Sequence, residues 1–282
     1  MTKISVAGVL EGKAPKMYKW VPRPLVKWLA RTVHEDDLNY VLENFAGDGP
    51  FEFLRRFFAY TGVTYETVGL DKLDPSERYI FASNHPFGGM DGMMLAERIG
   101  THFGDVRVIV NDILMYLEPL RSIFVPVNKH GRQKGDYAVA FNETFEGSAP
   151  VLTFPAGLCS RCIANQVQDI EWRPNFVKRA NQTGRLIVPV FVEGQLSKRF
   201  YRLAGLRKKL GIKGNVEMIY LPDEMFRQKG QHFKLIFGEP ISPEVLREEG
   251  NYMMQAQQVR RMSYALVGRT PSPTDEETSD NF

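Results

Sequence analysis

From about residue 78 onward, short apolar segments rich in β-branched and aromatic residues alternate with helical segments. This alternation constrains the fold more than any other feature of the chain. The helical segments lie at about 91–100, 133–146, 172–183 and 243–266. The strand-like runs are RYIFAS (78–83), VRVIVN (106–111), SIFVPV (122–127), VLTFP (151–155), RLIVPVFV (185–192), VEMIYL (216–221) and FKLIFG (233–238). Nearly continuous apolar strands separated by helices are typical of a sheet buried on both faces. We therefore predict an α/β fold with a mostly parallel central sheet flanked by helices.

The chain divides by composition into three regions. Its 282 residues, 43% of them hydrophobic, are enough for one large domain or two small ones with a real core. We expect an N-terminal helical segment over 1–64, with two helices between 35 and 61 broken at Gly-Asp-Gly-Pro. An α/β domain over 65–268 follows. The tail 269–282 is polar and acidic and is expected to be disordered.

Residues 16–34, KMYKWVPRPLVKWLARTVH, mix basic side chains with tryptophan, leucine and valine. Two prolines favour a helix that starts near Pro24. A basic helix with tryptophan on its apolar side fits a helix that lies in a membrane interface. It equally fits a helix that packs on the domain while its lysine stems cover apolar surface.

Composition narrows the cellular setting and the partners. The net charge of +3 fits an anionic partner without requiring one. No secretory signal is evident, and no window approaches 18 uncharged apolar residues, so no transmembrane helix is expected.

The only cysteines, Cys159 and Cys162, form no disulfide framework, which favours a reducing compartment. Their C-x-x-C spacing lacks the second pair of a zinc site, and no metal or cofactor is expected.

The segment SNHPFGGMDGMM, residues 83–94, carries the chemistry. His85 and Asp91 are six residues apart, so they meet only if the intervening chain folds back. Gly88 and Gly89 permit such a turn. A histidine held by an aspartate is a general-base arrangement, because the carboxylate selects the tautomer and stabilises the imidazolium. Two plainer alternatives stay open here: Asp91 caps the next helix, and His85 is a structural histidine.

Other catalytic motifs do not account for this segment. No Gly-Lys-Ser/Thr follows the turn, which excludes a phosphate-binding Walker loop. No G-x-S-x-G motif supplies a serine nucleophile. The sequence thus offers a histidine base without an evident activated nucleophile.

A second motif, LTFPAGLCSR (152–161), pairs with the first and precedes the apolar run RLIVPVFV. In this order, the motifs resemble those of the glycerolipid acyltransferase superfamily, which includes bacterial lysophosphatidate acyltransferases. The resemblance spans roughly residues 65–240. Its first block matches Asn84, His85 and Asp91, and its fourth matches Pro189 between two valines. Its third block matches Phe154, Pro155 and Gly157.

The chain departs from the family pattern at positions that bind glycerol phosphate in the family. The third-block glutamate is Ala156, and Pro126 stands near the expected second-block arginine. Five residues rather than four separate His85 from Asp91. We take the residues in and beside the motifs as candidates for substrate binding: Asn84, Gly88, Gly89, Phe124, Lys129, Arg132, Phe154, Pro155, Gly157, Ser160 and Arg161.

The residues of the two motifs more closely resemble those of a bacterial subgroup labelled hemolysin-like, whose members are similar to aminolipid O-acyltransferases. This resemblance implies acyl transfer from an acyl carrier protein or coenzyme A thioester to the hydroxyl of a lyso-glycine or lyso-ornithine lipid. His85 would act as the base, without an acyl-enzyme, and backbone N–H groups near Gly157 would stabilise the oxyanion. Two alternatives are kept: a lysophosphatidate acyltransferase, and a non-catalytic lipid-binding protein on the same scaffold.

The basic run 197–214, SKRFYRLAGLRKKLGIKG, fits docking of an acidic carrier protein or of anionic lipid, or a solvated helix face. No nucleic-acid-binding fold accompanies it, and no nucleic acid partner is expected. Together these features predict a peripheral enzyme at the cytoplasmic face of the bacterial inner membrane.

Overall fold

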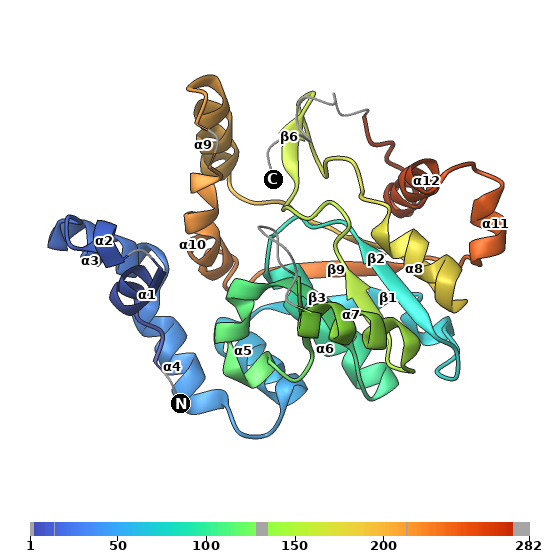
Figure 1. Cartoon of the computed structure of the whole chain (residues 1–282), viewed down its shortest axis with the longest axis horizontal. Coiled ribbons are helices and arrows are strands. Elements are labelled where there is room, and N and C mark those ends of the chain that lie inside the picture. The colour runs from blue at the N-terminus through green and yellow to red at the C-terminus, as the bar shows by residue number, and fades with distance from the viewer. Residues whose placement is uncertain (1–2, 14, 128–134, 213, 273–282) are drawn as a thin grey trace.

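A central sheet of seven strands organises the molecule (Figure 1). The computed structural model describes residues 3–13, 15–127, 135–212 and 214–272. The strand order is β1-β9-β8-β2-β5-β3-β4, and every neighbouring pair is parallel except β8 and β9. The strands are β1 (Thr64–Val68), β2 (Tyr79–Ser83), β3 (Arg107–Asn111), β4 (Phe124–Val127), β5 (Val151–Thr153), β8 (Leu186–Val192) and β9 (His232–Phe237). This architecture confirms the predicted α/β class.

The sheet is buried on both faces, and β2 shows why its strands are apolar throughout. All five of its residues are buried. Tyr79 and Phe81 belong to one hydrophobic core, while Ile80 and Ala82 belong to the other. Successive side chains of a strand point to opposite faces, so a strand between two cores must be apolar at every position.

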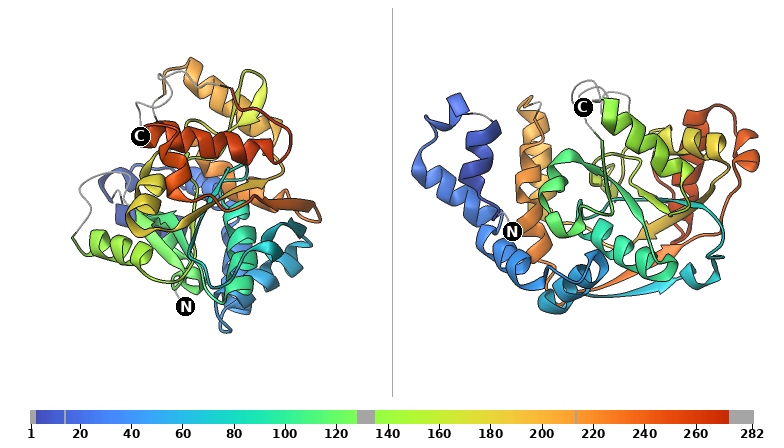
Figure 2. Two further views of the ribbon diagram at one scale, coloured as in Figure 1. Left: turned by 90° about the vertical axis from the view of Figure 1, so that its right-hand side faces the viewer. Right: turned by 60° about the horizontal axis from the view of Figure 1, so that its bottom comes forward.

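Helices cover both faces of the sheet (Figures 1 and 2). Side chains from α5 and α6 enter the first core, and side chains from α7, α8, α11 and α12 enter the second. The N-terminal helices are α1 (Val6–Lys13), α2 (Pro15–Tyr18), α3 (Arg23–Thr32), α4 (Glu35–Phe45) and α5 (Pro50–Thr61). The later helices are α6 (Met90–Phe103), α7 (Gly135–Glu146), α8 (Asn175–Thr183), α9 (Lys198–Lys209), α10 (Leu221–Phe226), α11 (Pro243–Arg247) and α12 (Tyr252–Ala265).

Four short 3-10 helices complete the described part of the chain, and one of them corrects a predicted strand. They are η1 (Leu70–Lys72), η2 (Asp112–Tyr116), η3 (Glu118–Leu120) and η4 (Val216–Tyr220). The run 216–221 is therefore helical, and the strand prediction there was wrong. Glu217 is buried while Val216 and Ile219 are exposed, which reverses the expected alternation. Periodicity alone cannot separate a strand from a helix in so short an apolar run.

Three further elements differ from the sequence prediction. Strand β1 was not predicted, because its polar residues Thr64, Glu66 and Thr67 obscure it. A two-stranded antiparallel hairpin, β6 (Arg161–Ile163) and β7 (Gln166–Gln168), was also missed. The single helix predicted over 243–266 is two helices, α11 and α12.

Helices α1 to α4 form an arm that extends away from the sheet (Figure 1; Figure 2, right). His34 joins this arm to α10, because its Nε2 lies 3.1 Å from Asp223 Oδ1 and its ring stacks on Phe226. Four side chains of α5 are buried in the first core: Phe53, Leu54, Phe57 and Phe58. The division of the chain into two regions at residue 64 stays a prediction.

None of the ten residues of α3 is buried. Leu25 and Trp28 are each 44% exposed, although the Trp28 ring also contacts the Tyr220 ring edge-on at a centroid distance of 6.0 Å, and Trp20 just before the helix is 87% exposed. Within the described residues, no helix has the length and apolar character needed to span a bilayer. Residues 273–282, most of the tail, lie outside the described part of the chain. The prediction that the tail is disordered falls mainly on these residues.

Candidate active site

The two sequence motifs meet beyond the carboxyl ends of the parallel strands, at the carboxyl edge of the sheet. Strands β2 and β5 are parallel neighbours, so the segments that follow them leave the sheet side by side. The backbone N–H of Ser160, in the second motif, donates to the carbonyl oxygen of His85 at 2.8 Å. The carboxyl ends of parallel strands are a common place for ligand sites in α/β proteins.

His85 and Asp91 are brought together by the turn between them. Nδ1 of His85 lies 3.0 Å from Oδ2 of Asp91. The Asp91 side chain is fully buried, whereas the His85 side chain keeps 17% of its surface exposed. Because a carboxylate only accepts hydrogen bonds, Nδ1 carries the proton and Nε2 is the basic nitrogen.

Asp91 does not act as the helix cap. The N-cap of α6 is Gly89, and Asp91 is the second residue of the helix. Its Oδ2 also accepts a hydrogen bond from Phe87 N–H at 2.9 Å, and its Oδ1 accepts one from Gly92 N–H at 2.9 Å. These bonds hold the carboxylate in place before any substrate binds, as a general-base pair requires.

The ring of Phe154 covers one face of the His85 imidazole. The two ring centroids are 4.1 Å apart, with an angle of 29° between the planes. Phe154, in the second motif, comes directly after β5. The stack therefore orients the imidazole from the neighbouring strand, while Asp91 orients it from its own turn.

The two turn glycines differ in what they require, and this yields a stability prediction. Gly88 has φ +69°, and an added Cβ would lie 2.9 Å from Leu221 Cδ1 and 3.1 Å from Cys159 Cβ. Gly89 has an extended φ of −175° and open space where its Cβ would be. We expect Gly88→Ala to lower the free energy of unfolding by about 1–3 kcal/mol, because left-handed backbone is strained for alanine and the side chain clashes.

Urea denaturation of Gly88→Ala beside Gly89→Ala measures this difference. Gly89→Ala is the matched control, and we expect its unfolding free energy to stay within about 0.5 kcal/mol of the wild type. Equal unfolding free energies for the two variants would contradict the conformation assigned to this turn.

Asn84 joins two strands instead of facing the edge. Its Oδ1 accepts from Val192 N–H at 2.7 Å, and its Nδ2 donates to the Val192 carbonyl at 3.0 Å. The side chain thus holds the ends of β2 and β8 together. This geometry favours a structural role over the predicted contact with substrate.

Other predicted binding residues lie away from His85 or outside the described chain. Phe124 is in register with Val108, which pairs with Leu152 of β5. Phe124 therefore lies near the amino end of β4, the outermost strand, and not at the carboxyl edge of the sheet, where His85 lies. Lys129 and Arg132 lie outside the described residues, and their roles stay predictions.

Pro155 and Gly157 shape the second turn. The carbonyl of Pro155 accepts from Arg173 N–H at 3.0 Å. Gly157 has φ +69°. Its own N–H donates to the Phe154 carbonyl at 2.9 Å. This particular N–H is therefore engaged within the turn, so an oxyanion donor has to come from another group of the edge.

Arg161 is held by a carboxylate that the sequence analysis did not select. Its Nη2 lies 3.0 Å from Oε1 of Glu217, whose side chain is fully buried. Arg207 Nε lies 2.9 Å from Oε2 of the same glutamate, at ion-pair distance but without hydrogen-bond geometry. Two guanidiniums and one carboxylate leave a formal charge of +1. A glutamate inside an otherwise apolar run was the signal that could have indicated this partner.

Ser160 contacts a second buried carboxylate that was also missed. Its hydroxyl donates to Oδ1 of Asp169 at 2.6 Å, and Asp169 is completely buried. The same Oδ1 accepts from the backbone N–H of His85 at 3.2 Å. Asp169 is 84 residues from His85, so no local motif could have indicated the contact.

The two cysteines have different surroundings. Cys159 is buried and Cys162 is exposed. Burial raises the pKa of the Cys159 thiol to about 11, despite the Arg161 guanidinium nearby. At neutral pH this thiol is protonated and is therefore a poor nucleophile. Within the described residues, no group of three or more potential ligands could hold a metal.

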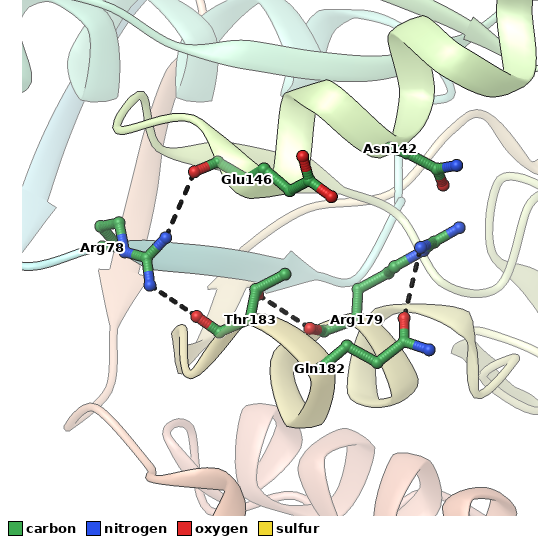
Figure 3. A pocket seen from close by; sticks show the side chains of 6 residues that line it. All are labelled: Arg78, Asn142, Glu146, Arg179, Gln182 and Thr183. Carbon is green, nitrogen blue, oxygen red and sulfur yellow. Dashed lines mark hydrogen bonds between the residues drawn. The ribbon is translucent and has the colours of Figure 1, made fainter.

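A surface pocket, whose lining side chains Figure 3 shows, lies beside the segments that lead into the amino ends of β2, β5 and β8, whereas His85 follows the carboxyl end of β2. It is lined by Arg78, Asn142, Glu146, Arg179, Gln182 and Thr183. Arg78 donates to the carbonyls of Glu146 and Thr183, the last residues of α7 and α8. A guanidinium at helix C-termini satisfies carbonyls that lack helical partners. This pocket is therefore explained by helix capping, and the candidate active site is the edge that carries His85.

Comparisons with known proteins show what the whole chain is similar to. A family model described as acyltransferase matches residues 8–270. Two curated proteins named lyso-glycine lipid O-acyltransferase, from Phocaeicola vulgatus and Bacteroides thetaiotaomicron, are each 37% identical over 264 residues. These alignments cover 93% of this chain and 95% and 97% of the two relatives.

A solved structure is similar in fold. It is the crystal structure of the 1-acyl-sn-glycerophosphate acyltransferase PlsC from Thermotoga maritima, with a TM-score of 0.50 and 16% identity. The alignment covers 95% of both chains. At this level of identity, the similarity supports the shared fold.

Proposed function

Because the chain belongs to the acyltransferase family and is therefore an enzyme, we propose that it transfers a fatty acyl group to the hydroxyl of a lyso-aminolipid. The observation that carries the proposal is the His85–Asp91 pair, 3.0 Å apart at the carboxyl edge of the sheet. The name shared by the two relatives favours a glycine lipid as the acceptor. Membership of an enzyme family sets aside the non-catalytic lipid-binding alternative.

In the proposed reaction, Nε2 of His85 removes the proton of the acceptor hydroxyl. The alkoxide oxygen then attacks the thioester carbonyl, the new ester forms, and the carbon–sulfur bond breaks. The proton on His85 passes to the departing thiolate, which restores the neutral imidazole. Asp91 stabilises the imidazolium while it exists. The protonated state of Cys159 supports direct transfer without an acyl-cysteine.

Arg161 is the group we assign to the acidic head of the acceptor. A guanidinium binds a carboxylate or a phosphate through two parallel hydrogen bonds. One positive charge remains in the Arg161–Glu217–Arg207 cluster, which suits a singly charged carboxylate. Ala156 removes the carboxylate that the glycerol phosphate acyltransferases carry at this motif position, which argues against lysophosphatidate as the acceptor.

A side-by-side acceptor assay tests the proposed function. Labelled acyl groups would be supplied on acyl carrier protein and, separately, on coenzyme A. The acceptors would be lyso-glycine lipid, lyso-ornithine lipid and lysophosphatidate, and the products would be identified by mass spectrometry. We expect diacylated glycine lipid as the main product. Exclusive acylation of lysophosphatidate would overturn the proposed acceptor, and the more efficient thioester would identify the donor.

We also propose that the arm of helices α1 to α4 lies on the membrane that supplies the lipid, at the cytoplasmic face of the bacterial inner membrane. Trp20, just before α3, and Leu25 and Trp28 of α3 are all exposed. The distal end of α9 adds the exposed side chains Leu206 and Leu210, next to Lys208 and Lys209. Tryptophan and leucine beside lysine suit the boundary between anionic head groups and acyl chains.

Flotation with vesicles of phosphatidylethanolamine and phosphatidylglycerol checks this surface. We expect replacement of both Trp20 and Trp28 by serine to weaken partitioning by about tenfold or more, because each tryptophan loses a buried apolar area in the interface. Tyr252→Ser is the matched control, since Tyr252 is 43% exposed on α12, at the other end of the chain. Unchanged flotation of the double variant would contradict this membrane surface.

A further inference from the structure

Asp169 occupies a buried junction between the two motifs of the active site. It follows strand β7 and has no exposed surface. Three donors converge on its carboxylate: His85 N–H at 3.2 Å and Ser160 O–H at 2.6 Å on Oδ1, and Trp172 Nε1–H at 2.9 Å on Oδ2. Two of these donors belong to the motifs that form the candidate active site.

The backbone of Asp169 is itself held from α12. Its N–H donates to the hydroxyl oxygen of Tyr264 at 2.7 Å, and its carbonyl accepts from Arg260 Nη2 at 2.6 Å. Tyr264 is 1% exposed and Arg260 is 5% exposed. The carboxylate therefore projects from a backbone that is held by two buried side chains of α12.

A buried carboxylate is costly, so its presence here calls for an explanation. Burial raises the pKa of Asp169 above its usual value, and the hydrogen bonds from Ser160, Trp172 and His85 offset only part of this rise. The three donors therefore compensate part of the cost of burying the charge. An apolar side chain could fill the same space without that cost, but it could not accept a hydrogen bond from the backbone of His85.

We propose that Asp169 is a positioning residue that fixes the backbone of His85 and thereby the direction of its imidazole. Asp91 sets the tautomer from one side, Phe154 covers the ring, and Asp169 fixes the main chain from which the ring projects. This inference rests on the proposed function, in which His85 is the base. A displacement of about 1 Å in such a group can reduce the rate by about 100-fold.

The isosteric variant Asp169→Asn tests the inference. An asparagine has one acceptor oxygen and one donor amide in place of two acceptors. Whichever way it turns, its NH2 group faces either His85 N–H or Trp172 Nε1–H. We expect kcat to fall by about 10- to 100-fold, with KM for the donor thioester changed by less than about threefold, because geometry is lost more than binding.

A second substitution separates positioning from a general loss of structure. Trp172→Phe removes the indole donor, so the asparagine oxygen can turn toward His85 N–H and Ser160 without a clash. We expect Asp169→Asn/Trp172→Phe to have a higher kcat than Asp169→Asn and nearly the same kcat as Trp172→Phe alone. A purely structural role predicts the opposite, because Trp172 is fully buried and its truncation destabilises the core. The comparison with Trp172→Phe stands even if Asp169→Asn fails to fold.

A control for buried carboxylates in general is Glu97→Gln. Glu97, on α6, is 3% exposed and makes no contact with the two motifs. Its carboxylate accepts hydrogen bonds from the hydroxyls of Tyr65 and Thr101. We expect it to lower the unfolding free energy but to leave kcat within about twofold of the wild type. A similar loss of kcat in Glu97→Gln and Asp169→Asn would overturn the positioning role.

His85→Ala distinguishes failure of this inference from failure of the proposed function. In that background, Asp169→Asn should cause no further loss of the residual rate, because its effect passes through His85. A further loss would overturn the positioning role. Loss of activity in His85→Ala with full activity in Asp169→Asn would overturn the positioning role alone. Full activity in His85→Ala would overturn the proposed base, and the positioning role with it.

Discussion

Replacing His85 with alanine is expected to lower kcat for acyl transfer by about 10²- to 10⁴-fold, the range that a positioned general base contributes. The imidazole Nε2 is the basic atom of the pair, since Nδ1 faces Asp91 at 3.0 Å. Without it, the acceptor hydroxyl must lose its proton to water. Initial rates with labelled acyl thioester and saturating lyso-glycine lipid measure the effect.

Another histidine, His34, also lies beside carboxylates and serves as the matched control. His34 lies 3.0 Å from Asp37 and 3.1 Å from Asp223, in the arm and away from the carboxyl edge of the sheet. In detergent-dispersed substrate, His34→Ala should retain kcat within about twofold, because it touches neither motif. Circular dichroism would verify that both variants are folded. Robust transfer by folded His85→Ala would rule out His85 as the base.

Replacing Arg185 with methionine is expected to lower the free energy of unfolding by about 3–5 kcal/mol, since several buried carbonyls lose a charged donor. Arg185 has no exposed surface. Its guanidinium donates to the carbonyls of Phe145 at 2.8 Å, Ala149 at 2.9 Å and Tyr79 at 3.1 Å. It thus ties the end of α7 and the loop before β5 to the start of β2.

The charge of Arg185 persists in this setting. Burial lowers the pKa of Arg185 to about 10, which leaves it protonated at neutral pH. The C-terminal carbonyls of α7 provide the negative end of the helix dipole to this cation. Arg185→Lys should therefore be intermediate, because an ammonium keeps the charge but cannot reach carbonyls in several directions.

Urea denaturation measures these differences. Arg202→Met is the control, because Arg202 is exposed on α9, and its effect should stay within about 0.5 kcal/mol. If Arg185→Met proved as stable as Arg202→Met, the assigned network of carbonyls would not contribute to the stability of the fold.

Much of the fold was predictable because its strands obey a strong local rule. Strands such as β2 and β8 lie between two cores, so they are apolar at nearly every position and stand out in the sequence. Strand β1 is a polar edge strand and lacked that signal. The run 216–221 carried the apolar signal but is helical, and its glutamate is buried in ion pairs with two arginines.

The candidate site was predictable only in its local part. His85 and Asp91 lie six residues apart, and the glycines between them indicated a turn that would join them. Roles that depend on distant backbone were not predictable in the same way. The sequence did not indicate that the Asn84 amide bonds to Val192, 108 residues along the chain, and its predicted contact with substrate stays a prediction.

The sequence by itself determined the α/β class and the positions of the two motif turns, and it offered the pairing of His85 with Asp91 as one of several open alternatives. Each of these depends on residue types and spacings within a few turns of backbone, which hydrophobic periodicity and glycine positions record. Only the tertiary structure decided the partners of the residues at the candidate active site. Asp169, Glu217 and Trp172 reach their contacts through strand order and helix packing, and no spacing in the chain encodes those distances. A buried carboxylate reads as a surface residue in the sequence until the fold shows which donors compensate its charge.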